Sequence, residues 1–234
     1  MIEEKNFETY LSVTINKFEI FFFDKKKNKN LYTDELEIKN EKNFIDLINL
    51  SKFLDNNIFK IEKLSGEFVK SIYLIVEIDT VQNLNICVKK KFYDDTINQK
   101  NLENTLIELK DLFKENHQEQ KIMHMLIKNY IINGKSYPSF VSDIGGDYLC
   151  LEVSFISISS ELTFVFDKIL EKYQIKVNKY LDLEYLNKFF ESENLTLPKM
   201  ADKIINGYNK NEVILIPKNI ENKGFFEKFF QLFS

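Results

Sequence analysis

The spacing of apolar and polar residues predicts a chain in which strands alternate with helices. Residues 10–23 (YLSVTINKFEIFFF) and 30–38 (NLYTDELEI) alternate apolar with polar side chains around a Lys/Asn turn, a pattern that predicts a hairpin and fits a three-stranded meander. Residues 44–54 carry apolar side chains at helical spacing, and residues 71–78 (SIYLIVEI) form a short apolar run. This part of the chain therefore predicts strands, a helix and a further strand.

The next stretch predicts a second mixed segment. A strand-like run begins at Leu84, and apolar residues at helical spacing then mark a helix over residues 102–113. Residues 122–132 and 148–158 predict two strands joined by a loop that contains Gly and Pro. A helix start at Ser159-Ser160-Glu161 and a returning strand over 175–181 follow. The predicted order is strand, helix, strand, strand, helix, strand.

Beyond Phe190 the pattern becomes looser. Residues 191–194 predict a loop, residues 198–205 a short helix, and residues 212–216 (EVILI) a short apolar strand. Residues 217–223 (PKNIENK) have the composition of a polar linker.

The chain ends in residues 224–234 (GFFEKFFQLFS), which predict an amphipathic helix. On a helical wheel the apolar side chains fall within roughly 160°, and the charged ones fill the other side. So short a helix is not stable alone in water, so its stability must come from what the apolar face contacts. The pattern is typical of a helix at a membrane surface. A helix docked on the protein's own core is the alternative. The expected membrane-binding residues are Phe225, Phe226, Lys228, Phe229, Phe230, Leu232 and Phe233.

Composition narrows the classes of function. The chain has 234 residues, of which 44% are hydrophobic and 29% charged, so it can form one large domain or two small ones with a core. Its net charge is -4 and it contains no Arg, so no guanidinium is present to grip a phosphate or a base edge. Nucleic-acid binding is therefore disfavoured.

The cysteines and the N-terminus bear on the compartment. Cys87 and Cys150 lie in strand-like runs and are interpreted as small buried hydrophobic residues, because neither resembles a metal or redox motif. The N-terminal residues lack the basic and apolar regions of a signal peptide, and no segment reaches the roughly 18 apolar residues of a membrane span. We expect a cytoplasmic body.

Candidate catalytic chemistry is sparse. His117 and His124 are the only histidines, and the two cysteines are distant from them in sequence. No metal-ligand cluster or catalytic triad can be assembled from these residues. We expect no enzyme activity, no metal and no cofactor.

One stretch resembles a known family. Residues 120–132 (QKIMHMLIKNYII), followed by Asn133-Gly134-Lys135, resemble a strand and turn of the FtsA family of bacterial cell-division proteins, whose members carry an -LH-I-P--Y-IDG- pattern there. Met123-His124, Tyr130 and Asn133-Gly134 match this pattern, whereas Lys128 replaces the proline. The predicted elements that follow, including the helix over 161–173 and the strand at 175–177, are similar in order to the family's inserted strand-helix-strand-strand (SHS2) module.

The resemblance implies an α/β (α+β) fold in four parts. Residues 1–80 would form a partial actin-like first subdomain, and residues 81–190 an SHS2-like module. Residues 191–223 would contribute a helix, a strand and the polar linker, and residues 224–234 the amphipathic membrane-targeting helix.

The chain departs from the family at the nucleotide site. Members of the family begin with an Asp-Ile-Gly-Ser/Thr turn, whereas the corresponding residues 12–17 here are SVTINK, without the carboxylate and the glycine. Residues 143–147 (DIGGD) resemble the second phosphate loop of actin-like proteins but lack its third glycine and its threonine, so an ordinary turn is the better interpretation. Only residues 191–234 remain where the family has two further actin-like subdomains. We expect no ATP binding.

By this resemblance the protein would be a reduced, non-catalytic FtsA that acts as a scaffold on the cytoplasmic face of the cell membrane, at the division site. Its SHS2-like module would recruit division proteins and could self-associate. The implied partner-binding residues are Met123, His124, Tyr130, Leu149, Leu151 and Phe155. The subdomain that binds the FtsZ tail has no counterpart, so direct FtsZ binding stays open. Two alternatives remain: a nucleotide-dependent actin-like ATPase, and a soluble interaction module related to actin-like pilus-assembly proteins whose tail docks on its own core.

Overall fold

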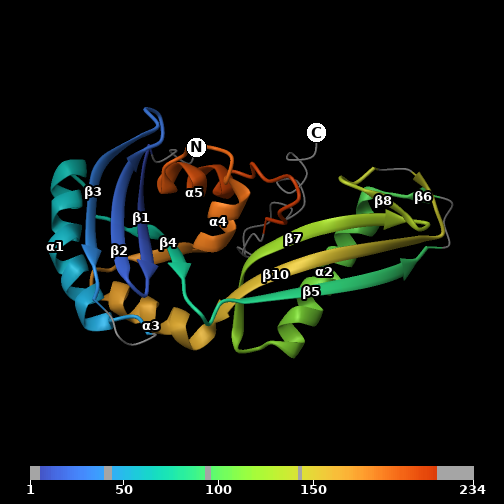
Figure 1. Cartoon of the computed structure of the whole chain (residues 1–234), viewed down its shortest axis with the longest axis horizontal. Helices are drawn as coiled ribbons and strands as arrows, with labels where there is room; N and C mark the ends of the chain where they lie inside the picture. The colour runs from blue at the N-terminus through green and yellow to red at the C-terminus, as the bar shows by residue number, and fades with distance from the viewer. Residues whose placement is uncertain (1–5, 40–43, 93–95, 142–143, 215–234) are drawn as a thin grey trace. The chain divides into compact units, whose positions relative to one another are not determined.

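The computed structural model describes residues 6–39, 44–92, 96–141 and 144–214, and the chain divides into two compact units (Figure 1). The first unit comprises Met1–Val81 and Ser159–Asn206, and the second comprises Gln82–Ile158 and Gly207–Ser234. The chain therefore leaves the first unit after Val81 and returns to it at Ser159.

A five-stranded sheet forms the centre of the first unit, in the order β11-β4-β1-β2-β3. Strands β1 (Phe7–Thr14), β2 (Lys17–Asp24) and β3 (Lys29–Glu37) form an antiparallel meander, as predicted. Strand β4 (Ser71–Glu77) pairs in parallel with β1, and β11 (Lys176–Asp182) pairs in parallel with β4.

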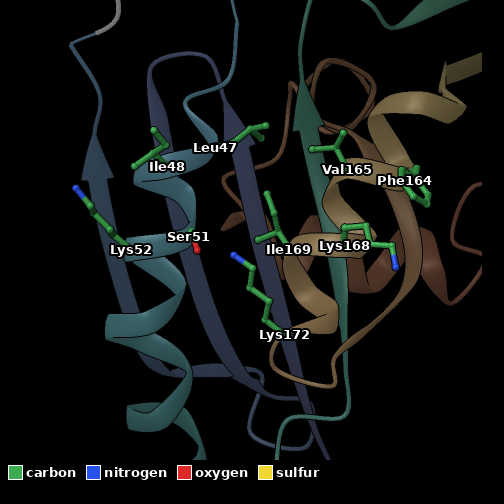
Figure 2. Close-up of a pocket in the computed structure, with 9 residues that line it drawn as sticks. All are labelled: Leu47, Ile48, Ser51, Lys52, Phe164, Val165, Lys168, Ile169 and Lys172. Carbon is green, nitrogen blue, oxygen red and sulfur yellow. The ribbon is translucent and has the colours of Figure 1, made fainter.

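Four helices accompany this sheet: α1 (Leu47–Ser65), α3 (Ser160–Glu171), α4 (Leu183–Phe189) and α5 (Leu197–Ile205). Strands β1 and β2 have runs of buried residues on both faces, as strands between two helical layers do. The ring of Phe18 on β2 lies 6.2 Å from that of Phe53 on α1. In Figure 2, α1 and α3 lie side by side over one face of the sheet.

The second unit contains a four-stranded sheet in the order β5-β10-β7-β8. Its elements follow the order strand, helix, strand, strand, as β5 (Gln82–Lys91), α2 (Gln99–Asn116), β7 (Gln120–Ile132) and β10 (Tyr148–Ser159). Apolar residues of α2, such as Leu106 and Phe113, form one core with residues of the sheet. These four elements follow the predicted strand, helix, strand, strand order; the assignment to an SHS2-like module stays a prediction.

Tight turns complete the second unit. Asn133 and Gly134 have φ values of 48° and 80° and form the two-residue turn from β7 to β8 (Lys135–Tyr137), which is the geometry that favours Asn-Gly. Strands β6 (Thr96–Ile97) and β9 (Ile144–Gly145) pair in a separate two-stranded sheet.

The two units do not follow the predicted boundaries. The expected module over residues 81–190 includes α3 and β11, whereas the structure places both in the first unit. The reason is a non-local pairing, because β11 extends the first sheet beside β4. The α/β (α+β) fold class is confirmed. The helix predicted over residues 224–234 lies outside the described residues.

Candidate functional site

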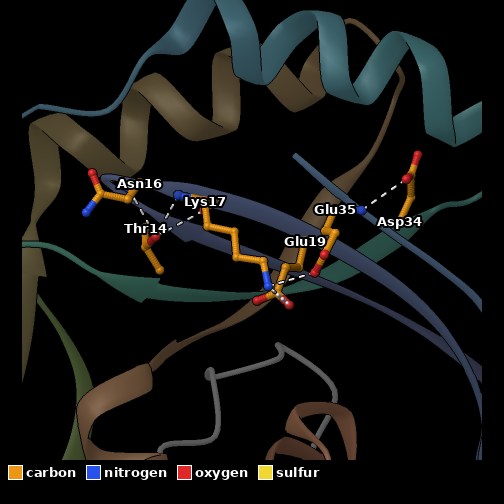
Figure 3. A network of polar contacts seen from close by, with 6 residues as sticks. All are labelled: Thr14, Asn16, Lys17, Glu19, Asp34 and Glu35. Carbon is orange, nitrogen blue, oxygen red and sulfur yellow. Dashed lines mark hydrogen bonds and ion pairs between the residues drawn. The ribbon is translucent and has the colours of Figure 1, made fainter. Parts of the chain in front are cut away.

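The turn between β1 and β2 occupies the position of the expected first phosphate loop. The hydroxyl of Thr14 accepts hydrogen bonds from the backbone N–H groups of Asn16 (3.3 Å) and Lys17 (3.0 Å), and it donates to the carbonyl of Lys17 (3.1 Å; Figure 3). Backbone N–H groups of this kind are what a phosphate-binding loop presents to its ligand. Here a side chain of the turn itself already occupies them.

The one cation of this turn is also engaged. The Nζ atom of Lys17 lies 2.7 Å from a carboxylate oxygen of Glu35 and 2.9 Å from one of Glu19, and Figure 3 shows the side chain extending along the sheet toward both. The hydrogen bond to Glu35, and to a smaller extent the one to Glu19, raises the pKa of Lys17. The turn therefore offers neither a carboxylate for a metal ion nor an available cation for a phosphate.

The carboxyl ends of the parallel strands are the usual ligand-binding edge of such a sheet. Two acidic residues end these strands: Glu77, the last residue of β4, is exposed, and Asp182, the last residue of β11, is buried. Its carboxylate accepts a hydrogen bond of 2.9 Å from the backbone N–H of Tyr185 and so caps α4. Within the described residues, no group of three or more His, Cys, Asp or Glu side chains could hold a metal ion.

The loop that resembles the second phosphate loop is a packed structural element. Residues Ile144–Gly145 form β9 and pair with β6. A Cβ atom at Gly146 would lie 2.9 Å from Cγ2 of Ile132, which leaves no room for a side chain. Asp143 lies outside the described residues. This arrangement agrees with the interpretation as a turn.

A groove on the first unit lies between α1 and α3. It encloses about 510 Å³ (Figure 2). Its apolar lining includes Ile48 on α1 and Phe164 on α3, which are 71% and 60% exposed. Exposed apolar side chains on both helices that border one hollow are typical of a protein-binding surface. Its charged lining residues are Lys52, Lys168 and Lys172.

The two helices expose these residues because their other faces form the core. Helix α1 buries Leu50, Leu54 and Ile58 at helical spacing, which turns Ile48 and Lys52 outward. Helix α3 in the same way buries Phe166, Ile169 and Leu170. The groove is thus the seam between two amphipathic helices that share one face of the sheet.

Tyr173, just after α3, fixes the spacing of the two helices. Its hydroxyl donates to Oδ1 of Asp55 (2.6 Å) and approaches the carbonyl of Ser51 (3.2 Å), and both residues belong to α1. Burial, together with the hydrogen bond to Asp55, raises the pKa of Tyr173 to about 12. The phenol therefore stays neutral at physiological pH and keeps its proton for this bond.

A second hollow of about 520 Å³ lies on the other side of α3, toward β11. It shares Phe164 and Lys168 with the first groove. The Nζ atom of Lys168 is 5.6 Å from the ring centroid of Phe164 and 2.6 Å from a carboxylate oxygen of Glu171. The side chain of Phe164 therefore lies between two hollows, and a partner in either hollow could contact it.

The structure buries every predicted partner-binding residue of the second unit. Each of these side chains is at most 3% exposed; they are Met123, His124, Tyr130, Leu149, Leu151 and Phe155. The last four belong to the core shared with α2, because β10 is an inner strand between β5 and β7. These side chains therefore form the interior of the unit rather than a contact surface. Partner binding by the module stays a prediction.

The chain itself covers part of the edge of β7. The N–H of Ile127 donates to the carbonyl of Asn211 (2.8 Å), and the N–H of Val213 donates to the carbonyl of Met125 (2.8 Å). Nδ1 of His124 lies 2.8 Å from Oε1 of Glu212, and both side chains are buried. The predicted strand over 212–216 thus begins as an added edge at Glu212; residues 215 and 216 lie outside the described residues.

The cysteines are not buried as predicted. Cys87 is exposed and Cys150 is partly exposed. The neighbours of Cys87 on β5, Ile86 and Val88, pack against the core beneath α2. Because successive side chains of a strand point to opposite faces of the sheet, Cys87 points to the other face. Sequence patterning cannot show which face of a two-sided strand a helix covers.

The predicted membrane-binding residues, from Phe225 to Phe233, lie outside the described residues. In the part of the chain that the structure describes, no helix combines the length and the apolar character needed to cross a bilayer. The sequence pattern did not predict the α1–α3 groove. The sequence feature that could have indicated it is the position of the apolar residues Ile48 and Phe164, which do not lie on the buried faces of their helices.

Comparisons with known proteins support the fold. No protein-family model matches the sequence, and no curated protein matches it. Among solved structures, a chain of the "PilM-PilN type IV pilus biogenesis complex" matches with a TM-score of 0.51 and 9% identity, over 80% of this chain and 50% of that one.

Two further structures match less well. One is the cytoplasmic domain of EpsL, an inner membrane component of the type II secretion system of Vibrio cholerae, with a TM-score of 0.33 and 8% identity over 75% of this chain and 56% of that one. The other is a Bacteroides thetaiotaomicron protein with an actin-like ATPase fold and unknown function, with a TM-score of 0.31 and 14% identity over 83% and 61%. The chain spans about half the length of the PilM–PilN chain it matches. The protein has an actin-like fold, as predicted, and the narrower FtsA assignment stays a prediction.

Proposed function

We propose that this protein is a non-catalytic scaffold that binds an acidic, amphipathic segment of a partner protein in the groove between α1 and α3. The observation that carries this proposal is the pair of exposed apolar side chains, Ile48 and Phe164, that face one hollow beside three lysines. An apolar groove between helices is a common receptor for an amphipathic helix.

Charge complementarity specifies the partner. The whole chain has a net charge of -4, yet the charged residues that line the groove are Lys52, Lys168 and Lys172. A positive site on a negatively charged protein attracts an acidic segment and repels a basic one, which gives specificity more than affinity. The apolar side of such a segment would contact Ile48 and Phe164 while its carboxylates face the lysines.

A synthetic amphipathic helix provides the test. We would use a labelled peptide of about 18 residues, long enough to form a helix on binding, with Leu on one face and Glu on the other. Fluorescence anisotropy should show binding that Ile48→Glu and Phe164→Glu each weaken at least tenfold. The matched control is Phe59→Glu, at a residue of α1 that is equally exposed but does not line the groove.

A second peptide with Lys in place of Glu tests the charge. It should bind much more weakly than the acidic peptide. Equal binding of the two peptides, or an equal effect of Phe59→Glu, would refute the groove as the site. Self-association would appear instead as a concentration-dependent change in mass that Phe164→Glu abolishes.

The β1–β2 turn, whose backbone N–H groups bond to Thr14, supports the part of this proposal that gives the protein no catalytic activity. Thr14 occupies the two backbone amides that a phosphate would require. A ligand that binds only the folded state raises its stability in proportion to the logarithm of ligand concentration over Kd. Millimolar Mg-ATP should therefore leave the melting temperature unchanged. A rise of several degrees would instead support the actin-like ATPase.

The narrower part of the proposal concerns the membrane. The fold is shared with a chain of a pilus biogenesis complex, and the amphipathic sequence pattern of residues 224–234 supports attachment at the cytoplasmic face of the membrane. The resemblance to FtsA would place the protein at the division site with division proteins as partners. Sedimentation with anionic liposomes tests attachment, with a variant that lacks residues 224–234 as the control. If the truncated variant partitions equally but is less stable, the tail docks on the protein itself.

Cells test the division role. An N-terminally tagged protein should form a midcell band in dividing bacteria, and the band should disperse without residues 224–234. A diffuse signal for both versions would remove the division role and leave the protein-binding scaffold.

A further inference from the structure

The two cysteines of the chain lie next to each other on the second unit. The Sγ atoms of Cys87 and Cys150 are 3.0 Å apart, although 63 positions separate the residues in sequence. Cys87 lies on β5 and Cys150 on its antiparallel neighbour β10. In the register of these strands Cys87 is opposite Glu152 and Cys150 is opposite Lys89, so the two thiols are diagonal neighbours on one face of the sheet.

The sheet is accessible to solvent at the two cysteines. Cys87 is exposed and Cys150 partly exposed, so a small oxidant can reach the pair. Buried cysteines are inert, whereas accessible thiols with a second thiol nearby are the usual sites of reversible oxidation.

We propose that Cys87 and Cys150 form a peroxide-sensitive dithiol that closes to a disulfide between β5 and β10. The proposal goes beyond the scaffold function, because it concerns the second unit and does not involve the α1–α3 groove.

The reaction proceeds in two steps. The Cys87 thiolate attacks one oxygen of the peroxide, the O–O bond breaks, and the released hydroxide takes a proton and leaves as water, or as an alcohol from an organic peroxide. Cys87 is then a sulfenic acid. Cys150 attacks the sulfur of Cys87, the S–S bond forms as the S–O bond breaks, and the leaving hydroxide takes the thiol proton of Cys150 as water. The two sulfurs lose two electrons, and the peroxide gains them.

The environments of the two thiols fit these roles. Cys87 is the more exposed and meets the oxidant first. Burial, followed by the hydrogen bond with Cys87, raises the pKa of Cys150 to about 11. Cys150 therefore stays protonated at neutral pH and reacts second, with the adjacent sulfenic acid.

Closing the bond requires a small movement within one sheet. The sulfurs must approach by about 1 Å to reach the length of an S–S bond. Because both strands belong to the same unit and are hydrogen-bonded along their length, rotation of the two side chains with a slight shift of the strands is sufficient. The product joins strands whose residues are far apart in sequence, which restricts the unfolded chain and stabilises the folded one.

The experiment uses the full-length reduced protein and hydrogen peroxide at a small molar excess. Intact mass should fall by two hydrogen atoms, maleimide-reactive thiols should fall from two to none, and peptide mapping should join the peptides that contain Cys87 and Cys150. Because the chain has two cysteines in total, the assignment is unambiguous. The melting temperature should rise by several degrees and return after treatment with dithiothreitol.

The variants Cys87→Ser and Cys150→Ser are the controls. Each keeps one thiol, so neither can form the intramolecular bond, and neither should show the reversible rise in melting temperature. The wild-type measurement decides the question even if a variant folds poorly. Two thiols that stay free, a mass gain from added oxygen atoms without a linked peptide, or linkage between separate chains alone would each overturn the proposal. Binding of the acidic peptide should be the same for the reduced and oxidised protein, so failure of this inference is distinguishable from failure of the groove.

Discussion

Tyr173 is a residue of the first unit whose side chain connects the two helices that form the groove. Its hydroxyl joins the end of α3 to Asp55 and Ser51 of α1. We expect Tyr173→Phe to lower the free energy of unfolding by about 1 kcal/mol and to weaken binding of the acidic peptide, because the two walls lose their connection. Urea denaturation and anisotropy measure the two effects. Tyr137→Phe, in the second unit, is the control; an unchanged peptide affinity in Tyr173→Phe would show that Tyr173 does not set the groove.

The same phenol predicts a loss of stability in alkaline solution. The folded protein raises the pKa of Tyr173 to about 12, above the value of about 10 in an unfolded chain. The neutral phenol therefore contributes its full stability below pH 10, and this contribution is lost as the pH rises from about 10 to 12. Between pH 9 and pH 11 the wild type should lose more stability than Tyr173→Phe. Parallel curves for the two proteins would contradict this assignment.

The pair of His124 and Glu212 is the corresponding polar contact of the second unit. Both side chains are buried, and their contact of 2.8 Å attaches the segment after Gly207 to β7. Removing one partner of a buried pair takes this contact away from the other, so we expect Glu212→Leu to cost about 3 kcal/mol. Glu212→Gln, which keeps a hydrogen-bond acceptor, should cost clearly less. Thermal unfolding measures both, and equal losses would show that only the volume of the side chain matters.

At the scale of elements, the spacing of apolar residues predicted most strands and helices. It failed where a buried polar residue interrupts the apolar pattern, and where one element follows another without a loop between them. The predicted helix over 44–54 extends in the structure over Leu47–Ser65. Its pattern is interrupted at Asn57, which is buried, donates to the carbonyl of Phe53 (2.8 Å) and accepts from the hydroxyl of Tyr32. Sequence shows that Asn57 is polar but not that Tyr32 satisfies it. Helix α4 was not predicted, because it follows β11 without a loop: Asp182, the last residue of β11, is also the residue that caps α4.

The end of α1 gives a prediction at this scale. Gly66 ends the helix with φ 73°, and its N–H donates to the carbonyl of Glu62 (2.9 Å). Nothing lies within 4 Å of a Cβ atom placed there, so Gly66→Ala meets only the conformational cost of a left-handed residue. We expect a loss of about 1 kcal/mol in chemical denaturation, with no effect on peptide binding. A larger loss would mean that Gly66 has a packing role as well.

For the whole molecule, the family resemblance implied four consecutive parts, whereas in the structure residues 82–158 of the second unit interrupt the first unit. Periodicity identifies a strand but not its partner, so nothing local shows that β11 belongs beside β4. The same limit applies to the candidate site. Lysines and apolar residues of the groove come from α1 and α3, which are far apart in sequence and meet only because both cover one face of the first sheet. Residues matched to a family motif, such as Met123 and Tyr130, were instead core residues.

The insertion predicts that the first unit can fold without the second. The chain leaves at Gln82 and returns near Ser157, and these two residues are direct partners in the pairing of β5 with β10. Paired residues on adjacent strands lie about 5 Å apart, so a linker of two or three glycine and serine residues can replace residues 82–158. A protein made of residues 6–81, this linker and residues 159–206 should show a cooperative thermal transition and circular dichroism of mixed helix and strand. It should bind the acidic peptide with the affinity of the full chain, and Phe164→Glu in the shortened protein should abolish binding.

Two other outcomes would contradict this prediction. A shortened protein that folds without binding the peptide would mean that the groove needs the second unit. A shortened protein that does not fold would mean that the two units are stable only together.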